Sequence, residues 1–292
     1  MRPDPRTGLN DAELLSYNTV RIMAESADES VSVGTGFVYE FRSSKQLPIL
    51  ALVTNRHVID NAQTVKLVFH QGKNNKVDFE AEKLAFIITQ FQEGVYKHPN
   101  PNIDLAFIPL GNIFTKFTQN GGMPFVSVFT RKNLPKDEEW KELTALEQVV
   151  IVGYPDGIWD SVNNLPILKR GVTATHPKVD FQGQPKFLID AAIYPGSSGS
   201  PVFLYEWKEV MLGQDLNLGK DKPRLAGILS SVYLHRQKGV MESVPIPTKR
   251  NEVPIMDVPN NLGVVIKSTE LDGFIPLIDE RIEKDRETQK QQ

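Results

Sequence analysis

Residues 194–201 of this 292-residue chain read YPGSSGSP and place three serines between glycines. A glycine-rich turn can expose a serine hydroxyl and aim backbone N–H groups into the same space. Acyl transfer needs that combination, a nucleophile beside donors for the developing oxyanion. Read locally, the stretch is also an ordinary turn, and Ser197, Ser198 and Ser200 are equivalent candidates.

Two other polar residues stand at the ends of apolar segments. His57 follows the apolar start of LVTNRHVID (52–60), and its near-neutral pKa suits a general base. Asp104 opens the apolar part of PNPNIDLAFIPL (99–110), where a partly buried carboxylate needs a partner such as an imidazole N–H. Each residue also has a purely structural interpretation: His57 could be a surface or buried core histidine, and Asp104 could be a turn residue at the start of a strand.

The order of the three candidates is more specific than any one of them. His57 precedes Asp104, which precedes Ser198, and this is the order of the chymotrypsin-type triad. The order differs from those of subtilisin and of the α/β-hydrolases. The hydrolase motif G-x-S-x-G would also need a glycine where this chain has Ser200. The order therefore favours Ser198, which has Gly199 after it and Gly196 two residues before it.

Short β segments separated by turn residues dominate the chain, which predicts an all-β fold. The predicted strands are Asn18–Ala24, Val31–Phe41, Leu50–Asn55, Thr64–Phe69, Val77–Ile88, Asp104–Leu110, Gln148–Tyr154, Ile167–Thr175, Lys186–Tyr194, Ser200–Tyr205, Arg224–Tyr233 and Leu262–Lys267. Helical periodicity is confined to Asp137–Glu147 and Thr269–Arg286.

The segment Gly111–Pro124 carries a cluster of turn residues and is the best candidate for a linker between domains. We expect an N-terminal domain, residues 1–117, carrying His57 and Asp104. The C-terminal domain, residues 118–292, would carry Ser198 and end in the helix near the C-terminus.

Composition narrows the function further. The net charge of −3 and the pI near 6.0 give no basic surface for nucleic acid and no polybasic segment for a membrane. The absence of cysteine excludes disulfides and thiolate sites, and no H-E-x-x-H motif is present, so we expect no metal and no cofactor. The polar N-terminus, without an apolar signal-peptide core, and the lack of cysteine lead us to expect a cytoplasmic protein.

Taken together, these stretches resemble the trypsin-like (chymotrypsin-fold) serine proteases, and in particular their HtrA-like branch. The blocks that carry the resemblance are GTGFVYEF (34–41), LVTNRHVID, DLAFIPL, FLIDAAIYPGSSGSPVF (187–203), RLAGILSS (224–231) and NLGVVIKSTEL. The resemblance implies two six-stranded β-barrels and a C-terminal α-helix. HtrA-like proteases usually carry a PDZ domain, and too few residues follow Ser198 for one to be expected here.

The resemblance also implies roles for single residues. Ser198 would be the nucleophile, His57 its general base, and Asp104 the group that orients the imidazole. The backbone N–H groups of Gly196 and Ser198 would form the oxyanion hole. Trypsin has an aspartate before its nucleophile that pairs with a newly cleaved N-terminus. Ser197 cannot form that ion pair, so we expect no activation by that route, and what orders the loop is left open.

The resemblance places substrate contacts on both sides of this loop. Ser230 would lie on the strand that binds the substrate backbone, while Ala192, Val232 and Gly263 would line the specificity pocket. None of these is charged, which favours small or medium apolar residues at P1. The alternative is that an acid from the insertion at residues 235–261, Glu242 or Asp257, reaches the pocket. This proline-rich insertion would either be functional, as a gate or docking site, or be a solvated loop.

The leading hypothesis is a serine endopeptidase that cleaves protein substrates through an acyl-enzyme on Ser198. A free intracellular protease must be restrained, so we expect control by a partner protein or a signal, as in stress or anti-phage defence. The alternative is a catalytically silent peptide-binding module on a protease fold. An esterase using the same triad is a third hypothesis, against which the long strand around Ser230 argues.

Overall fold

The structure is a computed structural model in which residues 7–89, 94–155, 158–205, 223–238 and 255–290 are described. The first half of the chain contains α1 (Asp11–Asn18), β1 (Thr19–Ser26), β2 (Val31–Arg42), β3 (Pro48–Thr54), α2 (Arg56–Ile59), β4 (Ala62–Lys73), β5 (Lys76–Val77), β6 (Leu84–Thr89), β7 (Tyr96–Lys97), β8 (Ala106–Pro109), α3 (Gly111–Gln119), β9 (Pro124–Phe125) and β10 (Phe129–Thr130).

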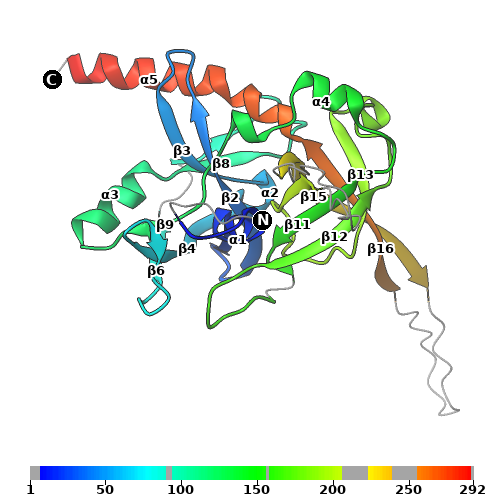
Figure 1. Ribbon diagram of the computed structural model, residues 1–292, viewed down its shortest axis with the longest axis horizontal. Coiled ribbons are helices and arrows are strands. Elements are labelled where there is room, and N and C mark those ends of the chain that lie inside the picture. The colour runs from blue at the N-terminus through cyan, green and yellow to red at the C-terminus, as the bar shows by residue number, and fades with distance from the viewer. Residues whose placement is uncertain (1–6, 90–93, 156–157, 206–222, 239–254, 291–292) are drawn as a thin grey trace, which may run out of the picture.

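The second half contains the 3-10 helix η2 (Arg131–Asn133), α4 (Asp137–Glu142), β11 (Gln148–Gly153), β12 (Ile167–Thr173), η4 (Phe181–Gly183), β13 (Lys186–Asp190), β14 (Pro201–Leu204), β15 (Arg224–Lys238), β16 (Ile255–Lys267), η5 (Ser268–Phe274) and α5 (Ile275–Lys290). Figure 1 shows the two halves side by side, with the first in blue to cyan and the second in green to orange.

The prediction of a mostly β fold with a C-terminal helix is confirmed. In the second half, the strands close into a barrel in the order β11-β12-β13-β16-β15-β14. In the first half, the ladder runs β5-β4-β1-β2-β3-β8-β7, and no pairing between described strands closes it. This sheet has ten strands rather than six. The twelve-residue β4 pairs along its length with β1, β5, β6 and β9, and the two-residue strands β7 and β10 pair with β8 and β2.

Alternating side chains give the strands of the first half two apolar faces. In β2, Phe37 and Tyr39 face a core that is shared with the second half. Val38 points to the opposite face, into a core made only of residues of the first half, which we call the interior core. Neighbouring β3 repeats the pattern, with Val53 in the shared core and Leu52 in the interior one. Since successive side chains of a strand point to opposite faces, this period of two places a core on each side of the sheet.

The second half is built the same way. On β11, Ile151 points into the closed barrel while Val152 joins the shared core. The adjacent β14 does so with Val202 and Phe203. The shared core therefore joins the two halves through the packing of buried side chains from both.

Three helices in the first half, α1, α2 and α3, were not predicted. Helix α1 begins with a capping box in which Asn10 and Glu13 bond each other's backbone N–H groups. Helix α3 occupies much of the stretch that the sequence predicted as a linker, and the boundary drawn after residue 117 falls within it. Its Phe117 packs edge-on against Phe69 and Phe86, so tertiary packing outweighs the local turn signals.

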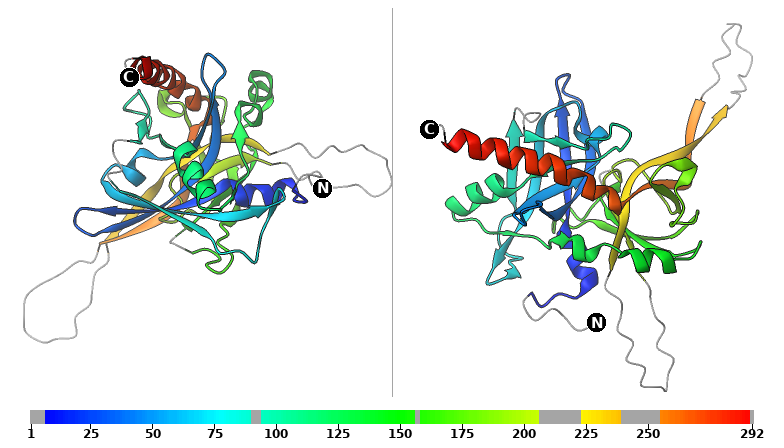
Figure 2. Two further views of the ribbon diagram at one scale, coloured as in Figure 1. Left: turned by 90° about the vertical axis from the view of Figure 1, so that its left-hand side faces the viewer. Right: turned by 90° about the horizontal axis from the view of Figure 1, so that it is seen from above.

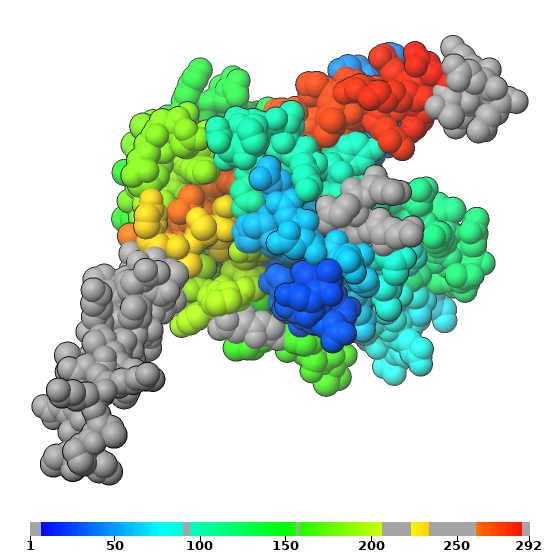
Figure 3. Space-filling view, turned by 180° about the vertical axis from the view of Figure 1, so that it is seen from behind, coloured from blue at the N-terminus to red at the C-terminus, as the bar shows by residue number. Residues whose placement is uncertain are grey.

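Helix α5 lies across the first half of the chain although it follows the last strand of the barrel (Figures 2 and 3). Ile278 is buried in the shared core, and Asp279 accepts hydrogen bonds from the backbone and hydroxyl of Ser44. Lys45 pairs with Glu283 further along the helix. The helix thus fastens the end of the chain to the hairpin between β2 and β3. Across the described ranges, no helix combines the length and the apolar character needed to cross a membrane.

The insertion predicted at residues 235–261 continues the two strands that flank it. Strand β15 runs to Lys238 and β16 begins at Ile255, and the two pair antiparallel in a hairpin that extends beyond the barrel (Figure 1). Residues 239–254 of the insertion lie outside the described residues. The predicted strand Val77–Ile88 is split into β5 and β6 around the acidic stretch that follows Val77.

Candidate active site

Buried neighbours fix the position of His57. It lies on the short helix α2, directly after β3, where Val58 and Ile59 anchor the helix in the interior core. The backbone of Gly34 passes so close that a Cβ on it would lie 2.4 Å from Cγ1 of Val58. A side chain at position 34 would displace α2, so glycine there is part of how the histidine is placed.

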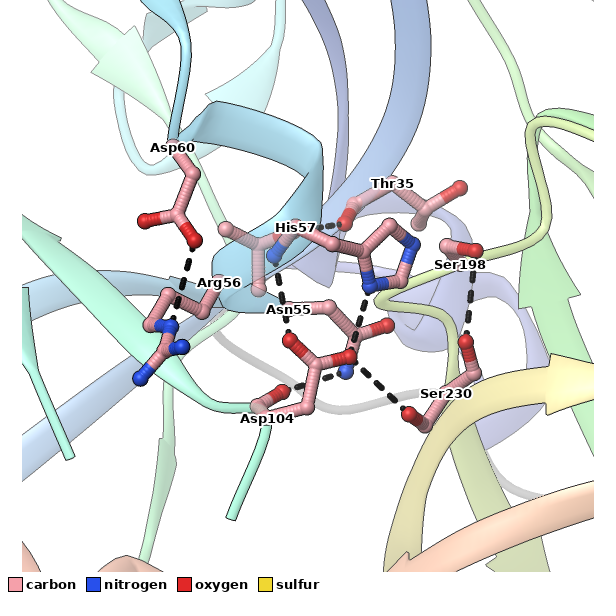
Figure 4. Close-up of polar contacts among 9 residues, drawn as sticks. Thr35, Asn55, Arg56, His57, Asp60, Asp104, Ser198 and Ser230 are labelled. Carbon is pink, nitrogen blue, oxygen red and sulfur yellow. Dashed lines mark hydrogen bonds and ion pairs between the residues drawn. The ribbon is translucent and has the colours of Figure 1, made fainter. Parts of the chain in front are cut away.

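His57 and Asp104 are directly bonded. Nδ1 of the imidazole lies 2.6 Å from Oδ2 of Asp104, and the backbone N–H of His57 donates to Oδ1 at 3.0 Å (Figure 4). Asn55 donates its side-chain amide to the Asp104 carbonyl at 2.8 Å. Asp104 itself stands between Ile103 and Leu105, both fully buried in the shared core. The carboxylate of Asp104 is therefore fixed by contacts of both oxygens with His57, and its backbone is fixed by the hydrogen bond from Asn55.

The environment keeps the carboxyl of Asp104 ionised. Burial alone raises its pKa, but the hydrogen bond and charge of His57, the His57 backbone N–H and the Ser230 hydroxyl together outweigh that effect. The net result is a pKa for Asp104 below its ordinary value. The Ser230 hydroxyl donates to Oδ2 at 3.0 Å, on the same oxygen that contacts the imidazole.

Ser198 lies in the loop between β13 and β14. Gly196 and Gly199 on either side of it have φ angles of +85° and +84°, a region that L side chains rarely adopt. The carbonyl of Ser198 accepts the Thr35 backbone N–H at 2.9 Å, and Gly199 N–H donates to the Leu229 carbonyl at 2.8 Å. The loop is thereby tied to β2 of the first half and to β15 of the barrel.

The hydroxyl of Ser198 points to Ser230. Its Oγ lies 3.5 Å from the Ser230 carbonyl, and within the described part of the chain it makes no hydrogen bond to His57. Figure 4 shows the ring of His57 beside Ser198, with Asp104 on the other side of the ring. Ser230 contacts both Ser198 and Asp104, which brings all three predicted triad residues into one cluster.

The two N–H groups predicted for the oxyanion hole belong to Gly196 and Ser198. Among the residues that the structure describes, neither donates a hydrogen bond to protein. The neighbouring peptide groups are occupied: Ser197 N–H donates to the Tyr194 carbonyl, and Ser200 N–H donates to the Ser197 carbonyl. Donors that have no partner in a tightly bonded turn are what an oxyanion requires.

The predicted pocket residues are brought together only in part. Val232 and Gly263 are directly paired across β15 and β16. Gly263 faces the barrel interior, where an added Cβ would lie 2.0 Å from Cδ1 of Ile193. Ala192 is exposed, and its carbonyl accepts a hydrogen bond from Nζ of Lys169 at 3.1 Å. The side chains next to Gly263 are those of Ile193, Leu229 and Ile189, all of which belong to the barrel core.

The alternative acids for this pocket cannot be placed: Glu242 lies outside the described residues, and so does the side chain of Asp257. Over the ranges that are described, no group of three or more His, Asp or Glu residues could hold a metal ion. The chemistry that the cluster can perform is proton transfer and nucleophilic attack by its own side chains.

Three polar residues of the site were missed or only half predicted. Ser230 was predicted for the substrate backbone, and its hydroxyl bonds Asp104 as well. Asn55 and Thr35 were not predicted at all, although both stand within quoted blocks, next to a strand end and between two glycines. Asn55 could have been suspected because it stands two residues before His57 at the end of a strand, whereas Thr35 has no comparable signal in the sequence.

The fold and the cluster define a protein of the trypsin-like class. The family model of the trypsin-like peptidase domain matches residues 34–211, and the chain belongs to this family. A comparison with curated protein sequences gave no match.

Solved structures are similar at low identity. An HtrA-type protease, AlgW with a tripeptide, has a TM-score of 0.51 at 12% identity, covering 91% of this chain and 62% of its own. A serine endoprotease from Yersinia pestis has a TM-score of 0.47 at 13% identity, covering 92% and 65%. An inactive mutant form of Rv3671c from M. tuberculosis H37Rv has a TM-score of 0.43 at 17% identity, covering 95% and 96%. The chain thus spans less than two thirds of the first two proteins, and the likeness to AlgW concerns the fold alone.

Proposed function

We propose that this protein is a serine endopeptidase that uses Ser198, His57 and Asp104. The observation that carries the proposal is the 2.6 Å contact between the imidazole and the Asp104 carboxylate, beside a serine in a glycine-flanked turn. The acceptor Oδ2 fixes the hydrogen of the neutral ring on Nδ1. The other ring nitrogen, Nε2, then keeps a lone pair and can act as a base.

The reaction begins when Ser198 Oγ attacks the scissile carbonyl and passes its proton to Nε2 of His57. The oxyanion that forms is stabilised by the N–H groups of Gly196 and Ser198. Collapse of this intermediate breaks the C–N bond, and His57 returns the proton to the leaving amine. Water then attacks the acyl-enzyme, loses its proton to His57, and releases the acid and the serine.

The hydroxyl of Ser198 must leave the Ser230 carbonyl before it can donate to His57. A rotation about its Cα–Cβ bond would release it, and the 3.5 Å separation from that carbonyl is long for a hydroxyl hydrogen bond. Hydrogen bonds between catalytic groups are often long or poorly aligned until substrate binds. We infer that substrate binding completes the alignment.

The proposed substrates are proteins or peptides. Strand β15 carries Ser230 next to the nucleophile loop, where an extended peptide can pair with it. The solved AlgW structure is described with a tripeptide, which agrees with this class of substrate for this fold. The residues predicted to line the pocket, Ala192, Val232 and Gly263, are uncharged, which supports small or medium apolar residues at P1. A cytoplasmic location and control by a partner protein or signal belong to the same proposal.

A second candidate function is a silent peptide-binding module. The observation that favours it is that Ser198 bonds Ser230 rather than His57. The two functions differ in turnover: an endopeptidase cleaves a mixed peptide library, and Ser198→Ala abolishes the cleavage. Ser197→Ala and Ser200→Ala are matched controls in the same loop that should keep activity. Peptide binding without cleavage by the unmodified protein would establish the module instead.

A further inference from the structure

We propose that Thr35 is the positioning residue that orders the nucleophile loop, in place of the ion pair that Ser197 cannot form. Thr35 lies on β2, in the half of the chain that carries His57, and its side chain is fully buried. It nevertheless bonds the loop of the other half, so that one residue connects the two parts of the site. The catalytic meaning of this inference rests on the function proposed above.

Every polar group of Thr35 is engaged. Its backbone N–H donates to the Ser198 carbonyl at 2.9 Å, and its own carbonyl accepts the Thr54 hydroxyl at 2.7 Å. Its hydroxyl lies 3.0 Å from the Gly196 carbonyl and 3.1 Å from the backbone nitrogen of Tyr154. The Tyr154 N–H can only donate, so the hydroxyl hydrogen is left to point at Gly196.

These bonds fix the peptide planes around the oxyanion donors. The peptide group between Gly196 and Ser197 is held at its carbonyl by Thr35 and at its N–H by the Tyr194 carbonyl. The Ser198 carbonyl is held by Thr35, and the Ser197 carbonyl by the N–H of Ser200. Because an N–H is opposite the carbonyl of its peptide group, holding the Ser197 carbonyl also aims the Ser198 N–H.

The backbone packs tightly around Thr35. A Cβ on Gly199 would lie 2.0 Å from the Thr35 carbonyl oxygen and 2.5 Å from the Thr54 hydroxyl. One on Gly153 would lie 2.9 Å from Oγ1 of Thr35 and 2.0 Å from Oγ of Ser200. The loop, β2 and the end of β11 therefore meet in a tight polar junction, in which the Thr35 hydroxyl bonds both the loop, at Gly196, and the residue after β11, Tyr154.

The test replaces the hydroxyl alone. Thr35→Val keeps the shape and both backbone bonds, whereas Thr35→Ser keeps the hydroxyl. Thr173→Val is the matched control: Thr173 is also buried, donates to the Ala145 carbonyl at 2.8 Å and accepts the Glu147 N–H at 2.8 Å, but lies on β12 away from the loop. Both valine variants lose one donor and one acceptor in a buried site.

With a peptide substrate, Thr35→Val should lower kcat by about 100-fold, as expected for misplaced donors, while KM stays within about threefold. Thr35→Ser should restore kcat, and Thr173→Val should keep it despite a similar fall in Tm. Equal kcat in Thr35→Val and the unmodified protein, or an equal loss in Thr173→Val, would overturn the inference.

Hydrogen exchange of the peptide covering residues 194–201 gives a second readout that does not depend on turnover. The amides of Ser197, Gly199 and Ser200 should exchange faster in Thr35→Val only. If the unmodified protein cleaves nothing, the proposed function fails, and the exchange result still decides whether Thr35 orders the loop. Unchanged exchange in Thr35→Val would contradict the inference in either case.

Discussion

The carboxylate of Asp104 holds His57 at two points. Oδ2 lies 2.6 Å from Nδ1 of the imidazole, and Oδ1 accepts the backbone N–H of the same histidine at 3.0 Å. The first contact selects the ring tautomer, and the second fixes the carboxylate plane relative to helix α2. Because the two contacts join the residues into one unit, a change of Asp104 should affect both the catalytic rate and the pH dependence of stability.

Asp104→Asn should leave the fold in place and remove most of the activity. An asparagine can present its amide group to Nδ1, which stabilises the wrong tautomer and leaves Nε2 without a lone pair. The loss in kcat should be on the order of 10⁴-fold, the size found for this change in a Ser-His-Asp triad. Steady-state kinetics with a peptide substrate measure it, and a loss below about tenfold would contradict the proposed role.

The lowered pKa of Asp104 predicts how stability depends on pH. A carboxyl whose folded pKa is below its ordinary value of 3.8 binds protons more weakly in the folded state than in the unfolded state. Its contribution is therefore present above that value and is lost as the pH falls through the folded pKa. The difference in Tm between the unmodified protein and Asp104→Asn should shrink as the pH is lowered from neutral to about 3. A difference that grows over this range would contradict the assignment.

Ser230→Ala should have a smaller effect than Asp104→Asn. The change removes a hydroxyl that donates to Oδ2 at 3.0 Å, one of the contacts that lower the pKa of Asp104. We expect kcat to fall roughly tenfold, in line with the loss of one hydrogen bond to a charged group. Ser231→Ala is the control, because Ser231 is exposed on the same strand. Equal kinetics for the two variants would show that the hydroxyl does not support the carboxylate.

Gly199→Ala should destabilise the protein far more than Gly183→Ala. Both glycines have positive φ, +84° and +71°, so each alanine costs roughly 1 to 2 kcal/mol of backbone strain. Only at Gly199 does the new Cβ also meet backbone, 2.0 Å from the Thr35 carbonyl oxygen, whereas nothing lies within 4 Å at Gly183. Chemical denaturation should show a further loss of about 1 to 3 kcal/mol for Gly199→Ala. Equal losses would mean that the junction with β2 is loose.

Val232 should influence the choice of P1 residue. It was predicted to line the pocket, it is half-buried, and it pairs with Gly263 across β15 and β16, so Val232→Ala should shift preference from small apolar residues toward larger ones such as leucine or phenylalanine. Cleavage-site profiling of a peptide library measures the preference of both proteins. A strong preference of the unmodified protein for arginine or lysine would contradict an apolar pocket.

The strands and the triad candidates could be predicted because their signals are local or lie in the order of the chain. The short apolar segments between turn residues, such as the run that forms β11, and the order of His57, Asp104 and Ser198 need no knowledge of contacts. Helix α3 could not be predicted in this way, because Phe117 is stabilised by aromatic side chains from β4 and β6. The turn residues of this stretch predict a linker, because local signals carry no information on these aromatic contacts.

The contacts that order the nucleophile loop could not be predicted from the sequence for the same reason. Thr35 and Gly196 are far apart in the chain and meet only when the two halves pack together. A threonine between two glycines has no distinctive pattern until its partners are known. Because Ser197 lacks the carboxylate that would order the loop in trypsin, another contact must order it, and the contact that we propose is Thr35, which bonds the carbonyls of Gly196 and Ser198.

The most direct measurement of the central claim is the site of covalent labelling by a fluorophosphonate. This reagent requires an activated serine beside a working oxyanion hole, and peptide mapping by mass spectrometry locates the adduct. Labelling is expected on Ser198 alone, lost in Ser198→Ala and strongly slowed in His57→Ala, with Ser197 and Ser200 unmodified. A correctly folded protein that binds peptides but takes no label at Ser198 would contradict the account.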